Sequence, residues 1–80
     1  MTLTQEQIKN LQRLLSDAHR SITAYKSLPR LESKQEVMYN VGKAMGAYHM
    51  VGDACIEAHI HACMQDLMDR YVEVTILTTH

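Results

Sequence analysis

"TQEQIKNLQRLLSDAHRSITAYKSLP", from Thr4 to Pro29, is the most regular stretch of the chain and determines the fold we expect. Its apolar residues recur at steps of three and four, which places them along one side of an α-helix. Thr4 and Gln7 have the spacing of a capping box, and Pro29 disfavours a helical conformation in the residue before it. We therefore predict a helix over residues 4–28, with a buried stripe formed by Ile8, Leu11, Leu15, Ala18, Ile22 and Tyr25.

Two more helical segments follow. Ser33 and Glu36 have the spacing of a second capping box, so we predict a helix over residues 33–51. The Gly-Asp pair that follows either ends this helix or kinks it, and an apolar pattern with helical spacing continues over residues 53–70. Short connections favour helices that pack side by side. The sequence thus predicts a single all-α domain over residues 1–80, either a helical hairpin or a three-helix protein.

The tail over residues 71–80, "YVEVTILTTH", has a different pattern. Val72, Val74 and Ile76 alternate with polar residues, and β-branched side chains dominate. This pattern is typical of an extended strand, which would have to pair with another copy or lie along the helices. The alternative is that the tail is the frayed end of the preceding helix, and the sequence leaves both conformations open.

The composition indicates a small and loosely specified core. A chain of 80 residues buries only about 60% of the surface that its unfolded form exposes. The chain has six methionines but no tryptophan or phenylalanine, and methionine specifies shape poorly. Its two cysteines cannot form a disulfide framework. Because association compensates for a small core, we expect a homo-oligomer.

The net charge of the chain bears on its binding partners, and its apolar runs and N-terminus bear on its location. The formal net charge of −1 argues against binding to a DNA or RNA duplex. Residues 1–43 hold seven basic and four acidic residues, a net charge of +3, whereas residues 44–80 hold one basic and five acidic residues, a net charge of −4. This asymmetry helps copies pair or favours a small anion, or it reflects solvated helix faces. No apolar run approaches the roughly 18 residues of a membrane span, and the N-terminus lacks a signal-peptide pattern. We therefore expect a cytoplasmic protein with reduced thiols.

Glycines interrupt the second predicted helix, although each costs roughly 1 kcal/mol relative to alanine there. Gly42 and Gly46 lie four residues apart and therefore share one helix face. Such a face allows tight packing on the first helix, close self-association or the approach of a flat ligand. For close self-association, we predict an oligomer interface that includes Gly42, Gly46 and Tyr48.

The segment "CIEAHIHACM" contains metal-ligating residue types. Cys55, His59 and Cys63 follow at steps of four, and Glu57 has the same spacing to His61. Positions four residues apart drift by about 40° around a helix, so three of them do not easily reach one ion. We therefore interpret the cysteines as small apolar residues and predict no metal or cofactor. A nucleophile with a positioned base and a phosphate-binding loop are also missing from the pattern, so we expect no enzymatic activity.

Tyr25, Lys26 and Arg30 lie near the predicted turn between the first two helices, and Lys43 lies on the second helix. An aromatic ring with several cations can stack a nucleobase and hold phosphates. Alternatively, Tyr25 simply ends the apolar stripe and the cations are solvated.

Two short motifs suggest a family. "AYKSL" (residues 24–28) and "MYNVGKAMG" (residues 38–46) resemble motifs of the helical-hairpin cyclic-oligonucleotide sponges of bacteriophages, of the anti-CBASS and anti-Thoeris type. The segment "AHIHACMQDLMDR" (residues 58–70) resembles the last helix of that family more loosely. The resemblance covers about residues 22–70.

The resemblance implies a non-enzymatic phage protein that sequesters cyclic di- or trinucleotide immune signals in the cytoplasm of the host. It implies that Tyr25 stacks a base and that Lys43 holds a phosphate, and Lys26 and Gly46 complete the expected ligand site. Two alternatives stay open: a small helical inhibitor that binds a host protein, and a metal-binding helical protein.

Overall fold

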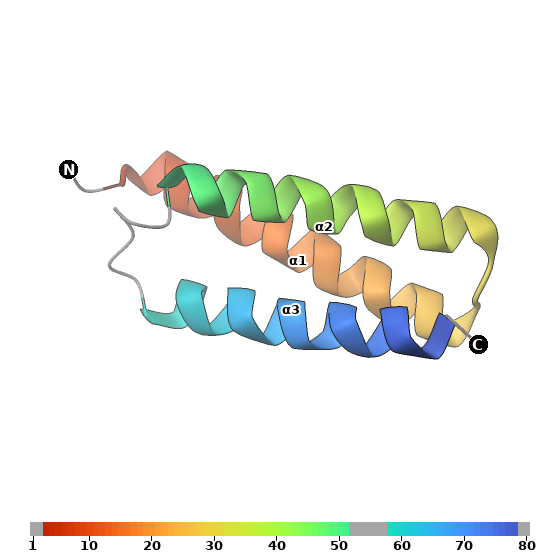
Figure 1. The fold of residues 1–80 in the computed structure, drawn as a ribbon. Helices are drawn as coiled ribbons and strands as arrows, with labels where there is room; N and C mark the ends of the chain where they lie inside the picture. The colour runs from red at the N-terminus through yellow and green to blue at the C-terminus, as the bar shows by residue number, and fades with distance from the viewer. Residues whose placement is uncertain (1–2, 52–57, 79–80) are drawn as a thin grey trace.

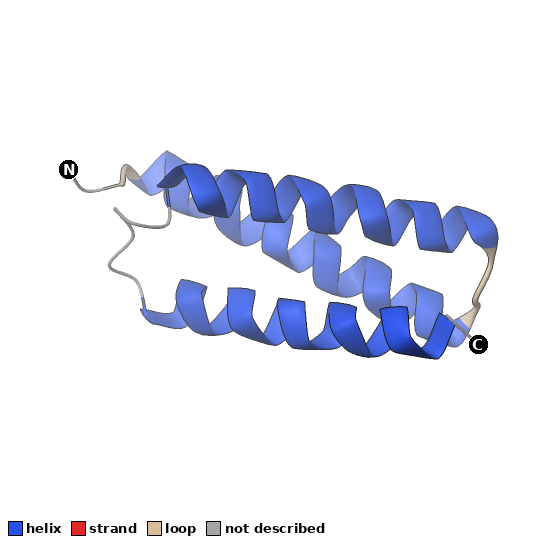
Figure 2. Cartoon of the chain, in the orientation of Figure 1, coloured by secondary structure: helices blue, strands red, loops and turns tan. Residues whose placement is uncertain are grey.

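The protein is a bundle of three long α-helices. The computed structural model describes residues 3–51 and 58–78, and from residue 75 onward it describes the backbone alone. The helices are α1 (Gln5–Ser27), α2 (Leu31–Val51) and α3 (Ala58–Thr78), and they form a rod of 44 × 18 × 17 Å (Figure 1). The described part of the chain contains helices and loops and no strand (Figure 2). The predicted all-α class is therefore confirmed, with three helices instead of a two-helix hairpin.

The start of α1 confirms the first predicted capping box. The Thr4 hydroxyl accepts a hydrogen bond from the Gln7 amide at 3.1 Å, and the Gln7 side chain accepts one from the Thr4 amide at 2.9 Å. At the other end, the Leu28 amide donates to the Ala24 carbonyl at 2.9 Å, and the chain then turns at Pro29. Both ends of α1 therefore lie within one residue of the predicted bounds.

The second predicted capping box, by contrast, is wrong. Helix α2 begins at Leu31, so Ser33 and Glu36 lie within it and do not cap it. The Lys34 amide donates to the Arg30 carbonyl at 3.0 Å, which places Arg30 at the position where a helix receives its first internal hydrogen bond. The helix starts earlier than predicted because the turn after Pro29 is shorter than the Ser33 signal suggested.

The core lies where the other two helices pack on α1. Helix α1 contacts both α2 and α3, whereas α2 and α3 contact each other at few positions (Figure 1). Every member of the predicted stripe is at least partly buried, and five of the six belong to the core. The core consists of Leu11, Leu15, Ala18, Ile22 and Tyr25 of α1, Val37, Val41 and Ala44 of α2, and Ile60, Met64, Leu67 and Val74 of α3.

The tail is helical as far as Thr78, so residues 71–78 adopt the helical alternative and not the extended one. Val74 is buried in the core and Tyr71 packs against it, at the helical spacing from Leu67. β-branched residues lower helix propensity only by tenths of a kcal/mol, so burial of one side of the segment outweighs their preference for strands. Residues 53–57, where we predicted the start of this helix, lie outside the described residues.

Replacing Leu15 with alanine should destabilise the fold strongly. Leu15 is 1% exposed, and the loss of a fully buried leucine costs about 2–5 kcal/mol of unfolding free energy. Urea denaturation followed by circular dichroism measures this loss. Leu31→Ala is the matched control, because Leu31 is 70% exposed and its loss should cost at most about 0.5 kcal/mol in an isolated chain. Equal effects of the two substitutions would contradict the core described here.

Candidate functional site

The structure places the residues of the predicted basic corner, at the end of the first helix, in different environments. Tyr25 is 8% exposed and belongs to the core, so its ring offers no face to a nucleobase. The ammonium group of Lys26 lies 3.3 Å from the Glu73 carboxylate, so this lysine links α1 to α3. The burial of Tyr25 agrees with the alternative in which it ends the apolar stripe.

Lys43 lies far from Tyr25 along the bundle. Asn40 of α2 donates a hydrogen bond to the Ser21 hydroxyl of α1, and this contact sets the register of the antiparallel pair. Because the helices are antiparallel, Tyr25 lies on one side of the Ser21–Asn40 contact along the bundle, and Lys43 lies on the other. At a rise of about 1.5 Å per residue, they are separated by about 10 Å along the helix axes. The structure therefore does not bring these two predicted ligand residues together.

The aromatic ring that accompanies Lys43 is Tyr39. The Lys43 ammonium group lies 4.4 Å from the centroid of the Tyr39 ring, within the range of a cation–π interaction. The two residues are one turn apart on α2, and both are exposed. This pair provides what the predicted corner lacks, an accessible ring next to a cation.

Gly42 and Gly46 share this side of α2 and are exposed. A Cβ atom added at either position would meet nothing within 4 Å. The possibility that these glycines allow tight packing on the first helix is therefore wrong for this chain, since they face away from α1. We define the outer site as Tyr39, Gly42, Lys43 and Gly46, a ring and a cation beside two positions with bare backbone.

Tyr48, which we predicted at an oligomer interface, connects α2 to α3 within the chain. Its hydroxyl is hydrogen-bonded to Nδ1 of His61, and the two rings meet edge to face with centroids 5.5 Å apart. Tyr48 is half-buried. It lines a groove between α2 and α3 and lies apart from the outer site.

The residues of the possible metal cluster face different neighbours. The side chain of His59 meets Gln12 of α1 at 2.9 Å, His61 meets Tyr48 of α2, and the Cys63 sulfur meets His19 of α1 at 3.6 Å. Cys55 and Glu57 lie outside the described residues. Within the described ranges 3–51 and 58–78, no three His, Cys, Asp or Glu side chains form a group that could hold a metal ion.

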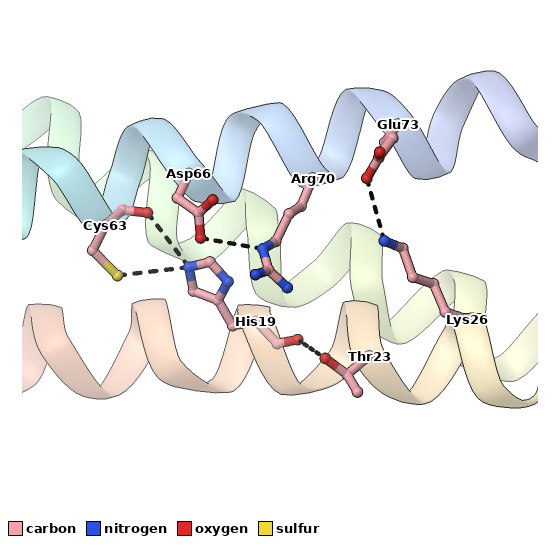
Figure 3. A network of polar contacts seen from close by, with 7 residues as sticks. All are labelled: His19, Thr23, Lys26, Cys63, Asp66, Arg70 and Glu73. Atoms are coloured by element: carbon pink, nitrogen blue, oxygen red, sulfur yellow. Dashed lines mark hydrogen bonds and ion pairs between the residues drawn. The ribbon is translucent and has the colours of Figure 1, made fainter.

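A row of polar contacts joins α1 to α3 (Figure 3). His19 Nε2 lies 3.4 Å from the Cys63 carbonyl oxygen and 3.6 Å from its sulfur. Burial raises the pKa of the Cys63 thiol, and the negative charge of Asp66 raises it further. At neutral pH this thiol is therefore protonated, which makes it a poor nucleophile.

Two arginines on α1 are the other cations that a ligand might use. Arg13 donates to the Asn10 side chain at 2.8 Å, and Arg20 pairs with Asp17 at 3.1 Å. Both arginines lie in open hollows of the surface, and no tyrosine is among the described residues that line these hollows. They form a second cationic surface, distinct from the outer site.

Sequence reasoning missed Tyr39 and His19. Tyr39 precedes Lys43 by four residues, the spacing at which helical side chains meet, so this pair was detectable in the sequence. His19 lies next to the apolar stripe, and its contact with Cys63 spans 44 residues of sequence, so no local pattern points to it.

Comparison with family models, curated proteins and solved structures gives no match to this chain. Among the described helices, none combines the length and the apolar character that crossing a membrane requires. Functional inference for this protein therefore depends on the geometry of its own residues.

The raised pKa of Cys63 predicts slow alkylation. In a Cys55→Ser background, iodoacetamide should react with Cys63 more slowly than with a free thiol at neutral pH, because little thiolate is present. Asp66→Asn should lower the pKa and speed the reaction, as it removes the neighbouring negative charge. The measurement is the alkylation rate as a function of pH.

Asp69→Asn provides the control, since it removes an exposed charge from the same helix that is not among the causes of the shift. If Asp66→Asn and Asp69→Asn changed the pH profile equally, the local influence of Asp66 would be refuted.

Proposed function

We propose that this protein is a non-enzymatic binding protein that sequesters a cyclic di- or trinucleotide at the outer site. The observation that carries the proposal is the exposed Tyr39–Lys43 pair, with the ammonium group 4.4 Å from the ring centroid. A cyclic oligonucleotide presents flat bases and one negative charge per phosphate. The outer site offers the Tyr39 ring to a base and the Lys43 ammonium group to a phosphate.

The glycines suit such a ligand. A base that stacks on Tyr39 approaches α2 along the side where Gly42 and Gly46 have no side chain and open space around them. Base–aromatic stacking contributes about 1–3 kcal/mol per base, and a hydrogen bond to a charged group about 1.5–3 kcal/mol. If several copies of the chain contact one ligand, these contributions combine and raise its affinity.

The proposal retains part of the site that the phage-sponge resemblance implies and changes the rest. Lys43 and Gly46 keep their expected roles, whereas Tyr39 replaces the buried Tyr25 as the stacking residue. Lys26 is not part of the proposed site, because its ammonium group forms an ion pair with the Glu73 carboxylate of α3. In this function the protein withholds an immune signal from an effector of the host and needs no chemistry of its own.

Substitutions at the outer site should weaken binding without unfolding the chain. Tyr39→Ala and Lys43→Ala should each raise the Kd roughly ten- to a hundredfold, the loss expected from one stacking or one phosphate contact. Tyr39→Phe should bind like the wild type, because it keeps the ring. Titration calorimetry against a panel of cyclic di- and trinucleotides is the measurement.

Lys34→Ala is the matched control, since Lys34 is another exposed lysine on α2 and lies outside the outer site. No binding by the wild type across the panel would end the proposal and favour the alternative of a helical inhibitor that binds a host protein. Binding that survives Tyr39→Ala and Lys43→Ala would instead place the ligand at the second cationic surface, near Arg13 and Arg20.

A further inference from the structure

The groove between α2 and α3 brings together side chains that can bind a soft metal ion. Its volume is about 290 Å³. The described residues that line it come from both helices: Met45, Tyr48 and His49 of α2, and His61, Met64, Gln65 and Met68 of α3. Three of the five methionines that the structure describes therefore meet at one groove, together with two histidines.

The Tyr48–His61 contact fixes the level at which the two helices face each other. The Tyr48 hydroxyl is hydrogen-bonded to Nδ1 of His61, and α2 and α3 run in opposite directions (Figure 1). Three residues back along α2 and three residues forward along α3 therefore lead to the same level. The residues at these positions are Met45 and Met64. Two thioether side chains, one from each helix, thus line the groove at the same level.

Met68 adds a third thioether one helical turn away. It follows Met64 by four residues, which amounts to about 6 Å along the axis of α3. Long side chains of a helix lean toward its N-terminus. Because α2 and α3 are antiparallel, this direction brings Met45 and Met68 toward each other. Methionine has three rotatable bonds, so the three sulfur atoms can turn toward one ion.

The chemistry of these donors selects the kind of ion. Thioethers are soft ligands that suit Cu(I), whereas Mg²⁺ and Ca²⁺ require oxygen ligands. Among the described residues that line the groove, none carries a carboxylate, and none is a lysine or arginine that would repel a cation. The metal-binding groups excluded above consist of His, Cys, Asp and Glu, so that exclusion does not bear on thioethers.

Packing of the core accounts for one of the three methionines more fully than for the other two. Met64 is 7% exposed and belongs to the core. Met45 and Met68 pack against this core, but both are only partly buried and border the open volume of the groove. This volume lies near the lower end of the range for small-molecule pockets, so it suits a single ion better than a nucleotide.

We infer that the groove binds one Cu(I) ion through the thioethers of Met45, Met64 and Met68. His49 is exposed at the edge of the groove, one turn after Met45, and offers a further donor. The ion is held without a change of its oxidation state. The inference goes beyond the proposed function, because the groove and the outer site share no residue.

Competition with a chromophoric Cu(I) chelator, in anaerobic buffer with ascorbate, tests the site. Thiolates also bind Cu(I), so the full chain carries Cys55→Ser and Cys63→Ser. We expect this chain to withdraw one Cu(I) ion from the chelator. Met45→Leu and Met68→Leu should each weaken binding by about tenfold or more, because even the loss of a partner behind a metal ligand costs about 10- to 100-fold. Leucine keeps the size of the side chain and removes its sulfur.

Met38→Leu and Met50→Leu are the matched controls, since each removes a thioether from an exposed position of α2 outside the groove. They should leave the affinity for Cu(I) unchanged. A helical Cys-free chain that withdraws no Cu(I) from the chelator would overturn the inference, and so would equal effects of the groove and control substitutions. If the serine variant unfolds, the cysteine-containing chain decides: Met45→Leu and Met68→Leu, combined, should lower its number of bound Cu(I) ions by one.

Discussion

The structure depends on the apolar stripe of α1, which is wide enough to receive two helices. Leu11, Leu15, Ala18 and Ile22 are 1% exposed or less, and α2 and α3 both pack on this helix more than on each other. Burial along one helix therefore holds the whole bundle together. One consequence is the groove between α2 and α3, which α1 does not fill. The same arrangement leaves the outer side of α2 uncovered.

The sequence predicted the parts of the fold that local patterns determine. The steps of three and four and the Thr4–Gln7 box predicted α1 almost to the residue, because capping and burial act together there. Where two signals compete, the prediction was wrong in one case and left two conformations open in the other. Ser33 and Glu36 have capping-box spacing but lie inside α2, and the β-branched residues after Arg70 continue α3 because Val74 is buried. Contacts between helices decided both cases, and a single sequence does not reveal them.

The candidate site was predictable to a similar extent. Gly42 and Gly46 were singled out from their spacing and Lys43 from its charge and from the family resemblance, and the structure leaves all three exposed on one side of α2. The aromatic residue predicted beside them, Tyr25, is buried. Tyr25 fits both the apolar stripe of the helix and the motif of the phage family, so the sequence is compatible with a core residue and with a base-stacking residue. Only the burial of Tyr25 distinguishes these two roles. A tyrosine at the end of an apolar stripe is ambiguous in this way, whereas a tyrosine four residues before an exposed lysine is less so.

The uneven packing of the helices also bears on how the chain opens. Helix α3 is attached to α1 by an apolar strip and a row of polar contacts, and its contacts with α2 are fewer and include the Tyr48–His61 pair. Detaching α3 would break its contacts with α1 and its fewer contacts with α2, and it would leave the more extensive α1–α2 hairpin in place. Partial opening of this kind exposes amide hydrogens to solvent at a lower free energy than global unfolding. Backbone amides of α3 should consequently exchange with deuterium as one group, ahead of those at the centre of α1.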